Sequence, residues 1–446
     1  GVLEGAILLG NRIFFFGGDI SPALLAVGFI VRLNIAVLIF IGGFLGWLVG
    51  IPLLGNGLEY AENPLHGAST LWSTKIRYVG VGAMVIGGLS SIIKVRKGLL
   101  DAVRILIDTQ KGNEQDVIPD HQRDMPARVI NFFSFLAIIL VGFVYYNITN
   151  NVGITILTTF IMIIMAFFFT AVASYIVGLV GNSNSPVSGM TITAVLFTGG
   201  LLYIFGFSGT EGMVATLGVA AIVCCAACTS GDVCNDLKTG QIVGSRPYRQ
   251  QIMQIIGVAV ASLIMAPILQ LLHDNTPGGI GGRELAAPQA GLFASLADGF
   301  FGEGNLPLDM VIIGAILGVL ILIADSAIFQ KSKNGEFRLH LMPIAVGMYL
   351  PFGLSTPILA GGLLAHFITL KSSSIEKPDN LLQNGVLLSS GLIAGESLMG
   401  ILLALLASAG IKSMNFVFQP DMITIFTFIS AISVVWWLYK NSLVKR

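Results

Sequence analysis

Long apolar runs recur along almost the whole chain, and they limit its fold more than any other feature. An α-helix needs about 20 apolar residues to cross the hydrocarbon core of a bilayer. Every backbone N–H and C=O inside hydrocarbon must be paired within the protein, which restricts spanning segments to helices and closed barrels. Only 11% of the 446 residues are charged, against about 25% in soluble domains. The sequence therefore predicts an all-α, polytopic membrane protein.

The apolar runs give a predicted topology. Full spans are expected at residues 35–54, 76–93, 129–148, 154–177, 187–205, 212–228, 252–272, 310–323, 386–407 and 422–438, with long loops at 229–250 and 273–309. Residues 341–370 are broken by Pro351, Gly353 and Pro357, and we expect a re-entrant pair of half-helices there. Basic residues at 94–104 indicate the cytoplasmic side. Counting from them, the C-terminus is expected in the cytoplasm, and the protein in the cell membrane.

Composition and motifs exclude several classes of function. The net charge is zero and no basic cluster or zinc-finger spacing is present, so nucleic-acid binding is not indicated. No Walker, Gly-x-Ser-x-Gly or His-Glu-x-x-His sequence occurs, so the chain is not predicted to be an enzyme and no cofactor is expected. Cys224, Cys225, Cys228 and Cys234 lie close together. Since no His or carboxylate completes a standard ligand spacing, we interpret them as small packing residues rather than a metal site.

A polar break separates the runs 154–177 and 187–205. Pro186 removes an N–H donor, and a helix restarting at Val187 begins with unpaired amides. Such amides, with the hydroxyl and amide side chains around them, suit a carboxylate or another anion. The alternative is a packing kink sealed by neighbouring helices. The predicted substrate-binding residues of this break are Asn182, Ser183, Asn184, Ser185, Ser188 and Thr191.

Four segments carry a family resemblance. Residues 183–191 read Ser-Asn-Ser-Pro-Val-Ser-Gly-Met-Thr and resemble a signature of the oligopeptide transporter family, which includes yellow-stripe-like metal-chelate carriers. Residues 230–240, 349–357 and 391–396 agree with it in family order. Asn-Pro-Gly and Lys-Ile-Pro-Pro-Arg motifs are absent, which favours the prokaryotic or yellow-stripe-like branch. The resemblance implies proton-coupled uptake of short peptides or peptide-like metal chelates.

An internal repeat is also visible. Residues 18–25 resemble residues 353–360 at a constant offset of 335. We expect residues 1–148 to form the C-terminal part of a first transmembrane repeat unit and residues 149–446 to form the second unit. If the units match, roughly 180 residues, or about four or five spans, of the first unit are absent. By analogy between the breaks, Tyr349, Ser355 and Thr356 are predicted to contact substrate.

Three carboxylates are candidates for proton coupling. Glu396 lies inside the span 386–407, where an ionised and unpaired carboxylate costs several kcal/mol. This cost favours proton uptake and suits a proton carrier; the alternative is a Glu that only holds helices together. Asp232 and Asp236 lie one helical turn apart. They are predicted to relay protons or bind a cation, or alternatively to pair with Lys238.

The resulting prediction is a secondary active transporter that works by alternating access in the lipid bilayer, with protons and a small peptide or chelate as partners. A homo-oligomer is compatible with the sequence. The first alternative is a passive channel for small polar solutes, lined by the same breaks. The second alternative, an intramembrane enzyme using Asp232 and Asp236, is disfavoured because two Asp on one turn of one segment lack the opposed geometry of a catalytic dyad.

Overall fold

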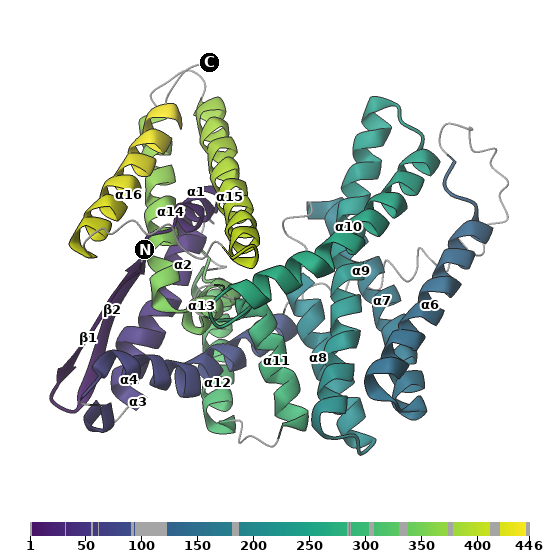
Figure 1. Ribbon diagram of the computed structural model, residues 1–446, viewed down its shortest axis with the longest axis horizontal. Coiled ribbons are helices and arrows are strands. Elements are labelled where there is room, and N and C mark those ends of the chain that lie inside the picture. The colour runs from purple at the N-terminus through teal and green to yellow at the C-terminus, as the bar shows by residue number, and fades with distance from the viewer. Residues whose placement is uncertain are drawn as a thin grey trace. The chain divides into compact units, whose positions relative to one another are not determined.

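The computed structural model confirms a helical, polytopic chain (Figure 1). It describes residues 2–31, 33–54, 57–60, 62–90, 93, 123–180, 187–282, 285, 287–302, 307–329, 338–372, 378–410 and 420–442. Nine helices within these residues are long and apolar enough to cross a membrane. The chain divides into two compact units. Unit 1 comprises Gly1–Ile86, Leu271–Pro288 and Pro307–Arg446, and unit 2 comprises Gly87–Gln270 and Gln289–Leu306.

Unit 1 combines a β-hairpin with helices from both ends of the chain. Strands β1 (Val2–Leu9) and β2 (Arg12–Asp19) pair in antiparallel register. The helices are α1 (Pro22–Ile30), α2 (Leu33–Gly43), α3 (Ile51–Leu54), α4 (Pro64–Leu71), α12 (Leu308–Ala324), α13 (Leu341–Tyr349), α14 (Phe352–Ser372), α15 (Pro378–Ser408) and α16 (Pro420–Ser442). Two π-helical turns, Phe44–Gly50 and Trp72–Ile76, continue α2 into α3 and α4 into a helix at 77–90.

The all-α expectation did not include this β-hairpin. The first part of its second strand alternates: Ile13 and Phe15 are buried, whereas Phe14 and Phe16 are exposed. Alternation with a period of two residues is what a strand with one buried face requires. The buried face joins an aromatic core with Trp47 of the first π-helical turn. The hairpin thus places Asp19 and Ser21 directly before α1.

Helices from opposite ends of the chain pack closely within unit 1. Figure 1 shows α1 and α2 in purple beside α13 and α14 in green, and α1 packs against α14 while α2 packs against α13. The backbone at Gly28 of α1 meets the Ile358 carbonyl of α14, and Gly361 of α14 meets the Leu25 carbonyl of α1, so that neither glycine has room for a Cβ. Small residues that allow close backbone approach are typical of helix pairs in membranes.

Asp325, buried at the end of α12, accepts a hydrogen bond of 2.7 Å from the Nη2 atom of Arg338. This ion pair, which precedes α13, raises the pKa of the Arg338 guanidinium. It fixes the segment from which α13 starts to the end of α12.

Unit 2 is a bundle of helices. Its helices are α6 (Ala127–Thr149), α7 (Val152–Val180), α8 (Val187–Ile204), α9 (Gly209–Val243), α10 (Pro247–Asn275), which ends in unit 1, and α11 (Pro288–Phe301). Met190 of α8 packs with Ile176 of α7 and Ala227 of α9 in a buried cluster. By contrast, the span in α10 has no buried residues, as expected of a helix whose apolar side chains face lipid or further protein.

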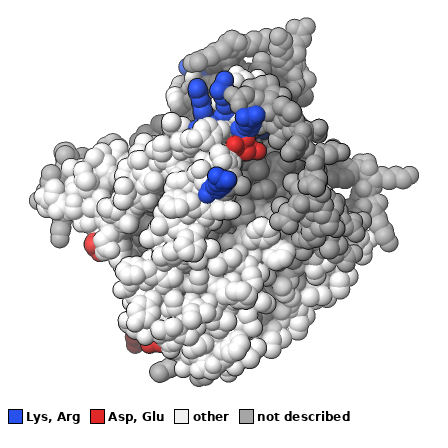
Figure 2. Space-filling view, turned by 90° about the vertical axis from the view of Figure 1, so that its right-hand side faces the viewer, with Lys and Arg blue, Asp and Glu red and all other residues white. Residues whose placement is uncertain are grey.

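Charge on unit 2 is sorted along the helices. All of its described basic side chains come from the segment before α6, the end of α9 and the start of α10; they are Arg123, Arg128, Lys238, Arg246 and Arg249. Figure 2 shows Lys and Arg gathered towards one end of the visible face, above a broad uncharged surface. This pattern agrees with an apolar band that crosses a membrane and a basic end beside it.

Most predicted spans agree with the structure, but two predicted loops and the predicted pair of half-helices need correction. The expected loop 229–250 is largely helical, because α9 has 35 residues and ends only at Val243, where Gly244 caps it with a φ of 79°. The expected loop 273–309 contains α11. The break in 341–370 falls at Leu350 and Pro351, but α14 then continues through Pro357 for 21 residues. The second part is therefore longer than a half-helix.

Candidate functional site

The first break of unit 1 lies between β2 and α1 and binds the carboxylate of Glu396. Ser21 is the N-cap of α1, and its Oγ accepts a hydrogen bond of 3.2 Å from the Leu24 amide. The Ser21 hydroxyl donates to Oε1 of Glu396 at 2.9 Å, and the Ala23 amide donates to Oε2 at 2.8 Å. Free amides at the start of a helix favour negative charge. The structure thus connects Glu396 of α15, a predicted proton-coupling residue, by hydrogen bonds to the N-terminal end of α1.

The second break of unit 1 separates α13 from α14. The carbonyl of Leu350, freed by the break, accepts a hydrogen bond of 3.1 Å from Nε1 of Trp47 in a buried position. The hydroxyls of Ser355 and Thr356 donate to the carbonyls of Phe352 and Gly353 at 2.8 and 3.0 Å. Ser355 is fully buried. These two hydroxyls therefore stabilise the first turn of α14 in this conformation.

The two breaks of unit 1 lie side by side. A Cβ added to Gly18 would come within 2.9 Å of Thr356 Oγ1, and Gly353 lies against the carboxylate of Asp19. These are the segments that match at the offset of 335, so the structure brings the matching segments together. They differ in what precedes them, because β2 leads into the first and α13 into the second. The repeat units and their boundary at residue 148 stay a prediction.

Tyr349, the last residue of α13, contacts an arginine that sequence reasoning missed. Arg77 donates a hydrogen bond through Nη2 to the Tyr349 hydroxyl. Its Cζ atom lies 4.8 Å from the centroid of the Tyr349 ring and 5.9 Å from that of Trp72. The signal was an arginine near the start of the apolar run 76–93, where a charge is expensive. Because the predicted span rests on average hydropathy, one arginine at its edge did not stand out.

The predicted break of unit 2 falls between the end of α7 and the start of α8, and most of its residues lie outside the part of the chain that the structure describes. Asn182, Ser183, Asn184 and Ser185 lie outside the described residues. Ser188 is half-buried in the first turn of α8. Thr191 is buried, and its hydroxyl donates to the Val187 carbonyl at 2.9 Å. That hydroxyl therefore serves its own helix in this conformation.

Asp236 lies at the far end of α9, where glutamines of α10 bind it. Gln254 donates through Nε2 to Oδ2 of Asp236 at 2.5 Å, and Gln250 donates to the Asp236 carbonyl at 2.9 Å. Lys238 instead donates to Gln241 of its own helix at 2.8 Å. The sequence alone gave these glutamines no role. The sequence feature that could have identified them is the presence of three glutamine side chains within the first two turns of a helix that follows a basic segment.

Asp232 and Asp236 both lie on an exposed extension of α9, and they do not form a pair buried among membrane helices. Both side chains are exposed. The 35 residues of α9 span about 52 Å at 1.5 Å per residue, whereas the hydrocarbon core is about 30 Å thick. If the apolar start of α9 crosses the core, its last turns project into the interface or into water. The two carboxylates would then lie outside the hydrocarbon core.

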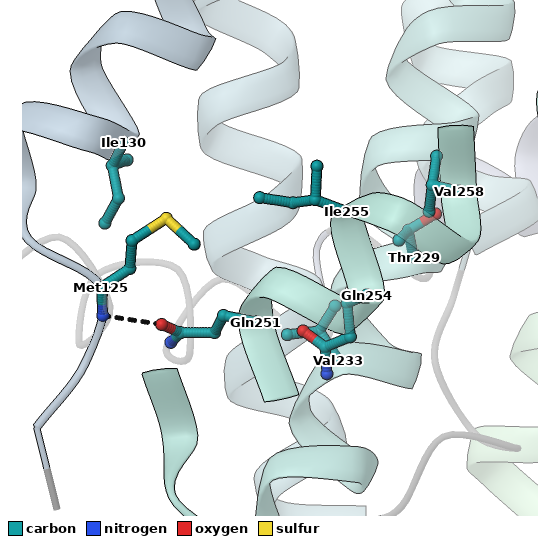
Figure 3. Close-up of a pocket in the computed structure, with 8 residues that line it drawn as sticks. All are labelled: Met125, Ile130, Thr229, Val233, Gln251, Gln254, Ile255 and Val258. Atoms are coloured by element: carbon teal, nitrogen blue, oxygen red, sulfur yellow. Dashed lines mark hydrogen bonds between the residues drawn. The ribbon is translucent and has the colours of Figure 1, made fainter. Parts of the chain in front are cut away.

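A pocket of about 380 Å³ lies beside this network, between α6, α9 and α10 (Figure 3). The Met125 amide donates to Oε1 of Gln251 at 2.8 Å at its edge. Figure 3 shows Met125 and Ile130 facing Ile255 across the space, with Gln254 next to Val233. The lining includes no charged side chain. Its chemistry suits an apolar group rather than a peptide or a chelate.

The four cysteines are free thiols on α9, and Cys225 and Cys228 are exposed. Within the described part of the chain, no group of three His, Cys, Asp or Glu side chains could hold a metal ion. Their interpretation as small helix residues stays compatible with the structure.

Comparison with known proteins gives consistent matches along the chain. A model of the family “OPT oligopeptide transporter protein” matches residues 2–407. A Haemophilus influenzae protein named “Putative oligopeptide transporter” is 30% identical over 439 residues, covering 91% of this chain and 69% of that protein. Rice “Probable metal-nicotianamine transporter YSL14” is 24% identical over 432 residues. Arabidopsis thaliana “Probable metal-nicotianamine transporter YSL8” is 23% identical over 431 residues.

The chain spans only part of these relatives. Each plant match covers 90% of this chain but 57% of the plant protein. All three relatives are named as transporters and none as an enzyme.

Proposed function

Because this chain belongs to the OPT oligopeptide transporter family, as its motifs predicted, we propose that the protein is a secondary active transporter. It takes up short peptides or peptide-like metal chelates together with protons, by alternating access across the cell membrane. The similarity to both a bacterial protein and plant yellow-stripe-like proteins supports this range of substrates. The complete transporter is the relevant unit, since the chain spans a little over half of its plant relatives.

One observation carries the proton-coupling proposal. Glu396 belongs to the span Gln383–Ser408, and its two oxygens accept from the Ser21 hydroxyl and the Ala23 amide at the start of α1. An ionised carboxylate is the better acceptor for both donors and is favoured by the helix N-terminus. Protonation removes the charge and weakens this attachment. Glu396 thereby links its proton occupancy to the position of α15 against α1.

Substrate binding is assigned to the breaks. Helix starts with unpaired amides attract anionic groups, and transporter sites built from broken helices use the same chemistry. Peptides and their metal chelates carry carboxylates and amines, which match such a site. Ser188 and Thr191 at the start of α8, with Tyr349, Ser355 and Thr356 around the start of α14, are the proposed contacts that the structure describes. Asn182, Ser183, Asn184 and Ser185 remain proposed contacts from the sequence. Asp232 and Asp236 are kept as secondary candidates for proton transfer.

Uptake into proteoliposomes tests this function. The full-length protein is reconstituted, an inward proton gradient is imposed, and a mixture of short peptides with and without iron, zinc or nickel chelates is supplied. Mass spectrometry then reads the internal contents. Accumulation above the external concentration, abolished by a protonophore, is the expected result. Equilibration that a protonophore leaves unchanged would instead identify a passive channel.

Glu396→Gln is the decisive variant in that assay. Glutamine keeps the shape but cannot change its charge, so gradient-driven accumulation should fall to equilibration while exchange of substrate across the membrane persists. Glu211→Gln is the matched control, because Glu211 is an exposed carboxylate in the first turn of another spanning helix, and it should accumulate substrate normally. If Glu396→Gln retains accumulation that depends on the proton gradient, Glu396 is not the coupling residue.

A further inference from the structure

We propose that Arg77 binds a carboxylate group of the transported solute, with Tyr349 and Trp72 holding its guanidinium group in place. The inference rests on the proposed transport function and identifies one subsite within it.

The first argument is charge. Arg77 is half-buried, and among the described residues no carboxylate lies within 4.0 Å of its guanidinium nitrogens. Its contacts are a tyrosine hydroxyl and two aromatic rings, all of them neutral. A charge taken out of water is strongly unfavourable unless it is paired. Residues 76–93 are a predicted span, and an ionisable side chain within a span is by default a functional-site hypothesis, for which an anion is the partner of opposite charge.

The second argument is unused hydrogen-bonding capacity. The Nε atom of Arg77 is buried and has no hydrogen-bond partner, and the same holds for Nε1 of Trp72. Buried donors of native proteins are nearly always paired. Stacking occupies the faces of a guanidinium and leaves its edge to hydrogen-bond, and that planar edge matches the two oxygens of a carboxylate. A carboxylate would supply both the missing charge and the missing acceptors.

The third argument is position. Tyr349 is buried and directly precedes the break between α13 and α14. Gly80, three residues after Arg77, lets the two helices touch, because a Cβ there would lie 2.9 Å from the Tyr349 amide nitrogen. Residues three apart share one face of a helix. The arginine is therefore held against the break itself by a close backbone approach, in contrast to a mobile surface side chain.

Trialanine and its C-terminal amide test the charge requirement without any mutation. In wild-type proteoliposomes, the amide should need a concentration about 10- to 100-fold higher for half-maximal uptake, which is the loss expected for a hydrogen bond to a charged group. Nickel–nicotianamine serves as the second solute. If wild-type vesicles accumulate neither trialanine nor the chelate, the transport proposal itself fails. If they take up trialanine and its amide equally well, only the Arg77 inference fails.

Arg77→Gln tests the same charge requirement by changing the protein instead of the solute. It should raise the half-saturating concentration of trialanine or of the chelate by the same about 10- to 100-fold, and it should no longer distinguish trialanine from its amide. Arg77→Lys keeps the charge without the planar fork and should fall between the two. A variant that slows acid and amide equally, at unchanged half-saturation, would show that Arg77 only supports the fold and would overturn the inference.

The chain offers a matched control. Lys371 also pairs with a tyrosine, donating to the Tyr439 hydroxyl at 2.7 Å with its Nζ atom 5.3 Å from the ring centroid. Unlike Arg77, Lys371 is exposed at the end of α14. Lys371→Gln should therefore leave half-saturation and the preference for the free acid unchanged. If Lys371→Gln raises half-saturation as much as Arg77→Gln does, the effect is not specific to Arg77 and the inference fails.

Discussion

Trp47 shows how one side chain stabilises a broken membrane helix. The break after α13 exposes the Leu350 carbonyl, and the Trp47 indole donates to it in a buried position. The ring also stacks on Trp72, with centroids 5.3 Å apart. An unpaired carbonyl in such a place costs about 1–3 kcal/mol. The break therefore depends on a tryptophan 303 positions earlier in the chain, because a backbone group freed by a break must be paired within the protein.

Trp47→Phe should destabilise the protein by about 1–3 kcal/mol, because phenylalanine keeps an aromatic ring but leaves the Leu350 carbonyl without its donor. The measurement is the thermal unfolding midpoint of the purified protein in detergent. Trp437→Phe is the control: Trp437 is exposed, and changes at such sites usually stay within about 0.5 kcal/mol. Equal midpoints for the two variants would contradict a structural role for this hydrogen bond.

Single residues divide clearly into those that the sequence could and could not identify. Glu396 stood out because a carboxylate within an apolar run is locally anomalous. Its partners Ser21 and Ala23 could not be found, since they lie 375 and 373 positions away and neither residue type is unusual at a helix start. Arg77 was anomalous too, but it stood at the edge of its run. A single charge inside a span marks such a residue, whereas an average of hydropathy over the span does not reveal it.

At the scale of elements, the breaks and spans were predictable because hydropathy and proline act locally. The predicted span 129–148 corresponds to the apolar helix Arg128–Thr149. Which helices pack against each other was harder to predict from the sequence. The match between residues 18–25 and 353–360 hinted at related segments, but only the structure places α1 against α14. The length of α9 was underestimated because its second half is polar but still helical. A span defined by average hydropathy ends where the polar residues begin.

The packing of α1 against α14 gives a test at this scale. Gly28→Val should lower stability by at least about 1–3 kcal/mol, because its side chain would meet the Ile358 backbone, which cannot move aside as a flexible side chain would. Gly391→Val in α15 is the control, since nothing lies within 4 Å of a Cβ there. Thermal unfolding of both purified variants decides the matter. A Gly28→Val protein as stable as the control would mean that this helix pair separates without cost.

For the whole molecule, orientation follows from charge. The end of unit 2 with Arg123, Arg128, Lys238, Arg246 and Arg249 is basic, as Figure 2 illustrates for one face. Lys and Arg near span ends favour the cytoplasmic side. The residues after α9 are therefore expected in the cytoplasm and those before α9 outside. The predicted cytoplasmic C-terminus depends in addition on how residues 341–372 cross the membrane.

Labelling of introduced cysteines checks this orientation. In a variant without Cys224, Cys225, Cys228 and Cys234, Ser245→Cys should react with an impermeant maleimide only in inside-out vesicles. Ser208→Cys, at the other end of α9, should react only in intact cells. Labelling of both from the same side would mean that α9 does not cross the membrane.

The position of the tryptophans has an optical consequence. The chain contains four: Trp47 and Trp72 stack beside the break after α13, whereas Trp436 and Trp437 are exposed on α16. Replacing the latter two by phenylalanine leaves the chain's tryptophan emission to the stacked pair alone. Trp72 adjoins the Arg77 guanidinium, so an arriving solute would alter the surroundings of a natural fluorophore. The protein thus carries an intrinsic fluorophore beside the proposed carboxylate subsite, and its emission can be measured without any attached dye.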